Sequence, residues 1–196
     1  MSQKERMEKG VWYDANFDLE LSKLRDKAED LCFQFNQIKP SQKRSRQAIL
    51  NKLFSHVGQD VTILSPIYAD YGYRTSIGKG TFINHDAYFM DGGKITIGRH
   101  CFIGPRCGLY TANHPLIYQE RNQGYEIALP IVIEDNVWIG GDVTILPGVT
   151  IGEGSVIGAK SLVNKDIPAH VVAVGNPCRI LRKIKKDDSI RDLCEL

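Results

Sequence analysis

The 196-residue sequence lacks any apolar stretch near the roughly 20 residues that a membrane-spanning helix needs. Its first residues, MSQKERMEKG, also lack the apolar segment of a secretory signal. We therefore expect a cytoplasmic protein that has no membrane partner. The net charge is only +2, and no basic stripe with interleaved aromatic residues occurs outside roughly the last thirty residues, so we expect no nucleic-acid partner.

Cysteine is scarce and shows no paired spacing. The five cysteines are odd in number, and they are scattered at positions 32, 101, 107, 178 and 194. This distribution favours reduced thiols over a disulfide framework. No Cys-x-x-Cys and no His-x-x-x-His occurs, so the sequence predicts no metal site.

An apolar residue returns every six positions in the second half of the sequence. The members of this run are Ile133, Ile139, Ile145, Ile151, Ile157 and Val163. Three of them are followed directly by glycine (Gly140, Gly152 and Gly158), which we expect in tight corners that require a positive φ. A period of six fits neither a helix nor a flat strand alone. It is typical of a parallel β-helix, in which short strands stack coil upon coil, so we predict a mainly β fold.

The period is interrupted by a phase shift around Asp91–Lys94, which follows Ile77, Ile83 and Phe89, and later by one long break. It is carried by Ile97, Ile103 and Leu109 before the break, and it restarts at Ile133. Because Leu109 and Ile133 are 24 positions apart, a multiple of six, residues 112–129 are predicted to form a loop extruded from a regular prism. Long loops in compact repeats are usually functional or disordered, and the tyrosines in this one favour an ordered, functional loop.

The N-terminal part has helical periodicity. Apolar residues spaced by four and three form one helical stripe, which Asn16 or Asp18 can cap and Pro40 ends. Ser41 can cap a second helix. The predicted organisation is a helical cap over residues 1–57, a β-helix over 58–184 that includes the loop 112–129, and a C-terminal tail over 185–196 without an assigned role.

Several motifs in combination resemble a known family. They are Gly10, Tyr13-Asp14, Leu19, Arg25 and Phe35-Asn36 in the cap, Asp70-Tyr-Gly-Tyr73, Phe82-Ile-Asn-His-Asp86, Thr111-Ala-Asn-His-Pro115, Asn136-Val-Trp-Ile-Gly-Gly141, Leu146-Pro-Gly-Val-Thr-Ile-Gly152 and Gly175-Asn-Pro-Cys-Arg179. Together they resemble the sugar O-acetyltransferases of the maltose and galactoside acetyltransferase type over almost the whole chain. The resemblance implies a left-handed β-helix, a homotrimer with active sites between subunits, acetyl-CoA as co-substrate without a metal, and a sugar or glycoside acceptor.

The loop contains the residue that matches the family's general base, His114. A neutral hydroxyl is a poor nucleophile for a thioester, and an imidazole is a suitable base at neutral pH. Glu126, late in the same loop, matches a family acid that could orient the imidazole and stabilise its charged form. The alternative for Glu126 is a solvated loop carboxylate.

The resemblance also implies acceptor-binding residues: Asp14, Asp70, Asn84 and Asp91. Carboxylates and amides are natural partners of sugar hydroxyls, and a site built from them rejects acceptors that cannot form hydrogen bonds. A structural role is the alternative for Asp14 and Asp70. The glycines that follow Asp91 leave its register open.

The outer groove of the later coils is predicted to hold the pantetheine arm of CoA. Gly141 and Ala159 match small positions that contact the arm, and Asn164 with Lys165 replaces the family's usual Thr-Lys pair. Arg179 and Arg182 are predicted to hold the CoA phosphates, because guanidinium groups pair well with phosphate. The alternative for these arginines is a solvated basic tail.

Other functions compete with the leading hypothesis of an acetyl-CoA-dependent O-acetyltransferase. The acceptor could be a non-sugar hydroxyl or an amine. The chain could also be a β-helix scaffold without turnover, or a metal hydratase, which would need several histidines to converge where the loop supplies one.

Overall fold

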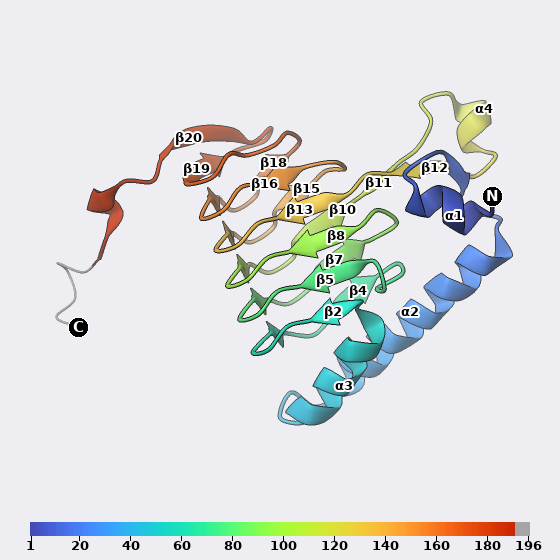
Figure 1. The fold of residues 1–196 in the computed structure, drawn as a ribbon, viewed down its shortest axis with the longest axis horizontal. Helices are drawn as coiled ribbons and strands as arrows, with labels where there is room; N and C mark the ends of the chain where they lie inside the picture. Colours follow the sequence, from blue (N-terminus) through green and yellow to red (C-terminus); the bar gives the residue numbers. More distant parts are fainter. Residues whose placement is uncertain (191–196) are drawn as a thin grey trace.

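The computed structural model describes residues 1–190, so the predicted tail 185–196 and Cys194 lie partly or wholly outside the described residues. The chain is mainly β. Figure 1 shows short strands stacked coil upon coil, with two helices across one end of the stack and a hairpin projecting beside it. The predicted parallel β-helix is confirmed. Among the described residues, no helix is both long and apolar enough to cross a membrane.

Three sheets form the faces of the prism. The β4 face contains, in spatial order, β18 (Leu162–Val163), β15 (Thr144–Ile145), β10 (Gly108–Tyr110), β7 (Ala87–Met90) and β4 (Ile67–Ala69). The β2 face contains β16 (Thr150–Ile151), β13 (Ile131–Ile133), β8 (Ile95–Ile97), β5 (Thr75–Ile77) and β2 (His56–Val57). The β3 face contains β20 (Arg179–Lys183), β19 (Val171–Val174), β17 (Val156–Ile157), β14 (Trp138–Ile139), β9 (Phe102–Ile103), β6 (Phe82–Ile83) and β3 (Thr62–Ile63).

The periodic apolar residues point into the prism and stack in register. Ile139 pairs with Ile157, 18 positions later, in parallel strands. Leu109 pairs with Ile145, 36 positions later, which is twice this coil length of 18. The segment between them therefore adds one coil length and leaves the phase of the repeat unchanged. These four residues are at most 1% exposed. Burial of the repeated Ile and Val side chains is therefore the main contribution that holds the coils together.

The glycines that follow the apolar residues are needed for close packing and not for a positive φ, which corrects the prediction. A Cβ on Gly140 would lie 2.6 Å from the amide nitrogen of Ala159 in the next coil, where no real Cβ fits. The positive φ of each corner falls two residues later, at Asp142 (58°) and Lys160 (60°).

Two helices close the lower end of the prism. α2 (Leu19–Gln37) begins at Asp18, whose carboxylate accepts a hydrogen bond from the amide of Leu21. α3 (Lys43–Leu53) has Gln42 at its N-cap without a side-chain bond, so the predicted cap at Ser41 is wrong: it lies one residue before the first helical carbonyl. The buried faces of both helices join the core of the β-helix.

The predicted loop is an ordered hairpin tied to the N-terminus. It contains β11 (Ala112–Asn113), a short helix α4 (Tyr118–Arg121) and β12 (Tyr125–Ala128). β12 lies between β11 and β1 (Tyr13–Asp14), which follows α1 (Gln3–Glu8). The N-terminal segment thus holds the hairpin by strand pairing (Figure 1).

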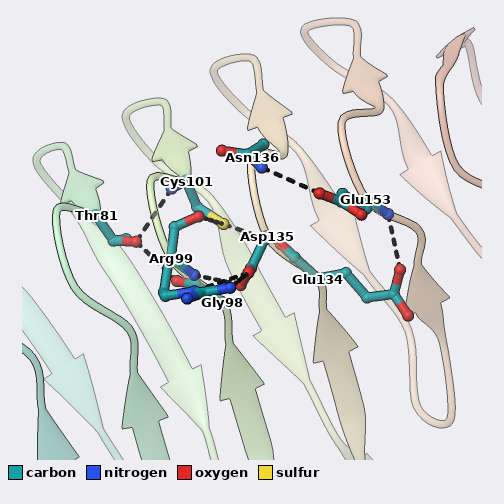
Figure 2. A network of polar contacts seen from close by, with 8 residues as sticks. All are labelled: Thr81, Gly98, Arg99, Cys101, Glu134, Asp135, Asn136 and Glu153. Atoms are coloured by element: carbon teal, nitrogen blue, oxygen red, sulfur yellow. Dashed lines mark hydrogen bonds and ion pairs between the residues drawn. The ribbon is translucent and has the colours of Figure 1, made fainter.

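The corner between the β2 and β3 faces is a polar ladder (Figure 2). The guanidinium of Arg99 donates to the Asp135 carboxylate at 2.6 and 2.8 Å, and the amide of Glu153 donates to the Glu134 carboxylate at 2.8 Å. The buried thiol of Cys101 donates to the Glu134 carbonyl at 3.1 Å. Because these groups connect one coil to the next, this corner is structural. Cys101 is free, as are the other three cysteines within residues 1–190.

Candidate active site

His114 follows β11 in the hairpin and has a defined orientation. Its Nδ1 lies 3.1 Å from the carbonyl oxygen of Tyr125 in the opposite strand. A carbonyl can only accept, so Nδ1 carries the proton and the neutral ring presents an unprotonated Nε2. The side chain is 45% exposed, so Nε2 is accessible to a substrate. This is the arrangement that a general base requires.

Glu126 faces Nε2 of His114. Its Oε2 lies 3.8 Å from Nε2, which is too long for a hydrogen bond, while its Oε1 accepts from the hydroxyl of Tyr13. Burial raises the pKa of Glu126, and the Tyr13 hydroxyl and nearby His114 oppose that rise. The carbonyl of Tyr125, and not Glu126, fixes the ring orientation. Glu126 instead presents a carboxylate oxygen where the imidazolium would form.

Sequence reasoning missed the side chains that support Glu126. Tyr13 is fully buried, and the guanidinium of Arg25 donates to the Tyr71 hydroxyl at 2.7 Å within the same cluster. Gly92 also borders the pair, because a Cβ there would lie 3.0 Å from the Tyr13 hydroxyl and 3.2 Å from Glu126 Oε1. Tyr13, Arg25 and Tyr71 belong to the family motifs, but no periodicity indicated that they meet at Glu126.

Two of the residues predicted to bind the acceptor substrate, Asp14 and Asp70, lie near this cluster. Each already accepts hydrogen bonds from the protein. Asp14 Oδ1 accepts from the amides of Asn16 and Phe17 at 3.1 and 2.9 Å. Asp70 accepts from the Tyr88 hydroxyl at 2.5 Å, and burial raises its pKa. Asp70 also lines a cavity of about 850 Å³ between α2 and the β4 face. Asp70 therefore borders a space that can hold a ligand.

Asp91 is a structural residue in this structure, which corrects its assignment to acceptor binding. It is 0% exposed. Its Oδ1 accepts from the amides of Tyr71 and Gly72 at 2.8 and 3.1 Å, and its Oδ2 accepts from the Thr75 hydroxyl at 2.9 Å. The carboxylate holds the turn between β4 and β5, and the backbone of the neighbouring Gly92 borders Glu126 instead.

We expect Asp91→Asn to change how stability depends on pH. Burial raises the pKa of Asp91 to about 6, so the folded protein binds this proton more tightly than the unfolded chain. Its contribution to folding is greatest below about pH 4 and falls by roughly 3 kcal/mol as the pH rises through 6. Asn keeps the acceptor oxygen and cannot ionise. Urea titrations from pH 4 to 7 should show the variant gaining stability relative to wild type; parallel pH curves would contradict the assignment.

The predicted donor residues Gly141 and Ala159 occupy the same position in successive coils. Each lies two residues after a paired isoleucine at the corner between the β3 and β4 faces, here called the Gly141 corner. Pro105 occupies that position one coil earlier, so the coil-to-coil ladder needs no N–H there. The ladder bond at this corner runs from the Lys160 amide to the Gly141 carbonyl, at 2.9 Å. Asn84 lies at the same corner, between β6 and β7.

The other predicted CoA ligands are exposed near the end of the prism. Asn164 and Lys165 follow β18, and Asn164 accepts from the Arg179 guanidinium at 3.4 Å. Arg182 is engaged by Asp188, whose carboxylate accepts two hydrogen bonds at 2.7 and 2.8 Å. This pairing holds the pKa of Asp188 at about 2. Arg179 is thus the more available of the two arginines.

Apart from these four residues near the end of the prism, the predicted residues are divided between two corners of one chain. Asn84, Gly141 and Ala159 lie at the Gly141 corner. Asp70, Asp91 and the hairpin with His114 lie at the opposite edge of the β4 face, here called the hairpin corner. A four-residue strand such as β7 separates these edges by roughly 13 Å at about 3.3 Å per residue. Within residues 1–190, no group of three or more His, Cys, Asp or Glu side chains could hold a metal ion.

Family models match both parts of this architecture. Residues 6–58 match the maltose acetyltransferase hexapeptide capping motif. Residues 130–165 match the bacterial transferase hexapeptide (six repeats), and residues 94–111 match the hexapeptide repeat of succinyl-transferase. The fold and these matches define a transferase built on hexapeptide repeats.

Solved structures identify the family. A maltose O-acetyltransferase from Clostridium difficile 630 is 45% identical, with a TM-score of 0.92 over 95% of this chain and 99% of that one. A galactoside acetyltransferase in complex with coenzyme A is 36% identical (TM-score 0.90; 96% and 94% covered). The acetyltransferase VCA0836 of Vibrio cholerae, complexed with acetyl-CoA, is 42% identical (TM-score 0.87; 95% and 100% covered). The chain belongs to the maltose acetyltransferase family of hexapeptide-repeat proteins. It is an acetyltransferase, so the resemblance is confirmed and a hydratase or an inert scaffold is not supported.

Proposed function

We propose that the protein transfers an acetyl group from acetyl-CoA to a hydroxyl of a sugar or glycoside, with His114 as general base. The observation that carries this proposal is the contact between His114 Nδ1 and the Tyr125 carbonyl, which leaves Nε2 free to accept a proton. The acetyl-CoA and coenzyme A complexes of the two relatives support the choice of donor.

The reaction follows from these groups. Nε2 of His114 takes the proton of the acceptor hydroxyl as its oxygen attacks the thioester carbonyl. Glu126 Oε2, 3.8 Å away, stabilises the imidazolium. The N–H of Gly141 is the candidate donor to the oxyanion, since the corner ladder uses the carbonyl of Gly141 and not its N–H. When the C–S bond breaks, the imidazolium returns the proton to the CoA thiolate.

Hydroxyl-rich acceptors fit the acidic and amide groups nearby. Asp14 and Asp70 supply carboxylate oxygens at the hairpin corner, and Asn84 supplies an amide at the Gly141 corner. The cavity beside Asp70, about 850 Å³, is within the usual range for small-molecule sites. Sugars and glycosides offer several hydroxyls in fixed geometry to such groups.

We further infer a homotrimer in which the Gly141 corner of one chain meets the hairpin corner of its neighbour. Reacting atoms must approach to roughly 3–3.5 Å, but one chain keeps the two groups on opposite edges of a face. In a trimer with cyclic symmetry, the two corners meet at each of three equivalent interfaces. Leu116 and Ile117 at the hairpin tip are 96% and 58% exposed, and a neighbouring subunit would cover them.

A CoA-release screen tests the proposed reaction. Monosaccharides, disaccharides, glycosides and amino alcohols are offered with acetyl-CoA, and the free thiol is measured. We expect release with hydroxyl acceptors and a product ester that hydroxylamine cleaves. An amide product would instead indicate an amine acceptor, and the absence of release with every sugar and glycoside would overturn the sugar assignment.

We expect Arg179→Ala to raise the KM for acetyl-CoA more than Arg182→Ala does. The Arg182 guanidinium is paired with Asp188, whereas among the described residues the Arg179 guanidinium donates hydrogen bonds only to Asn164 and the Cys178 carbonyl. Loss of one charge-assisted contact to phosphate corresponds to about a tenfold change or more. The KM for the acceptor should stay constant, and the effect should vanish with a donor analogue that lacks the phosphates. Equal losses with both donors would refute the assignment.

A further inference from the structure

We propose that Tyr13 is a positioning residue that fixes the Glu126 carboxylate opposite His114, so that the N-terminal strand β1 completes the catalytic centre. This inference rests on the proposed role of His114. It assigns to the first strand of the chain a function in the reaction itself, in addition to closing the end of the prism.

The strand register places the two side chains face to face. Tyr13 pairs with Glu126 in antiparallel strands, and residues that are directly opposite project on the same side of a sheet. The Tyr13 hydroxyl donates to Glu126 Oε1. Its ring is fully buried among Met7, Leu21 and Ala128, so it has one place to direct its hydroxyl.

The two carboxylate oxygens of Glu126 have different neighbours. Oε1 is held by Tyr13, and Oε2 lies toward Nε2 of His114. A carboxylate anchored through one oxygen cannot rotate freely, so the other oxygen keeps its place beside the imidazole. Gly92 also packs closely against this contact, because a Cβ there would crowd both the Tyr13 hydroxyl and Glu126 Oε1.

The hydrogen bond also affects ionisation. Burial raises the pKa of Glu126, and the bond from Tyr13 is the largest influence that opposes it. The other charged groups that face Glu126 are His114, Asp70 and Arg25; Asp70 raises its pKa, while His114 and Arg25 lower it. Burial and the charge of Glu126 raise the pKa of the Tyr13 phenol, which therefore stays protonated and remains a donor.

Tyr13→Phe removes the donor and keeps the ring. We expect the pKa of Glu126 to rise, measured by carbon-13 NMR of the side-chain carboxyl, and kcat to fall about tenfold, as for a hydrogen bond to a charged group. The KM for acetyl-CoA should not change. Tyr73→Phe is the matched control, since Tyr73 donates to a different carboxylate, that of Glu8, at 3.4 Å.

A double variant separates positioning from a general structural effect. If Tyr13 acts through Glu126, then Tyr13→Phe should cause no further loss of kcat in a Glu126→Gln background. Full additivity of the two losses, or an unchanged Glu126 pKa in Tyr13→Phe, would overturn the proposal. The NMR titration needs no acceptor, so it decides this point even if the proposed sugar transfer fails. Should Tyr13→Phe not fold, Gly92→Ala disturbs the same pair from the other side, and an unchanged Glu126 pKa there would also overturn it.

Discussion

His114→Ala should lower kcat by a factor on the order of 10²–10⁴, the usual contribution of a general base. The imidazole is the group that the hairpin presents with a free nitrogen, and its tautomer is set by the Tyr125 carbonyl. Wild-type activity should depend on pH through its general base, and the variant should lose that dependence. Steady-state kinetics across pH 5–9 measure both effects.

Acetyl-CoA binding should survive in His114→Ala, because the groups assigned to hold the donor, at Gly141 and Ala159, are distinct from the imidazole. Glu126→Gln should be milder, since it keeps the proton acceptor and removes only a neighbouring charge. His56→Ala, an exposed histidine on the β2 face, is the matched control. If His114→Ala kept near-normal kcat and the same pH dependence, a different group would be the base.

The β-helix could be predicted because its signal is local in sequence. Each inward residue repeats six positions after the last, and the match of Ile97 with Ile133 and of Leu109 with Ile145 shows that the hairpin leaves this phase intact. The reason for the glycines could not be predicted in the same way. Their constraint is the backbone of the next coil, as at Gly140, and the sequence does not state how closely coils approach.

A candidate site could be proposed from the sequence only where a residue type and its segment together indicated chemistry. His114 in the extruded loop met both conditions. Asp91 did not, because a periodic pattern tells which apolar residues face inward but says nothing of a carboxylate that turns inward to bind the amides of Tyr71 and Gly72. The Tyr13–Glu126 contact joins residues 113 positions apart through an antiparallel pair that lies outside the repeat.

Two inactive variants should restore each other when they assemble together. Gly141→Trp should block the donor groove and still fold, since a Cβ at Gly141 would meet Pro105 at an ordinary 3.4 Å. His114→Ala removes the base from the hairpin. If each active site combines the Gly141 corner of one chain with the hairpin of the next, a trimer that contains both variants has one intact site, whichever variant is present twice.

We therefore expect mixed trimers to recover about one third of wild-type kcat per trimer, whereas each variant alone stays at least about 10²-fold below it. The two chains are co-expressed with different affinity tags, and successive purification on both tags isolates mixed assemblies. Light scattering should give a mass of three 22.0 kDa chains. In the control, a chain that carries both Gly141→Trp and His114→Ala is co-expressed with the His114→Ala chain. No chain in these trimers has an intact His114, so no activity should return. If the first mixture also stayed inactive, or if the protein were a monomer at micromolar concentration, the two corners would not meet across an interface and the catalytic centre would have to lie within one chain.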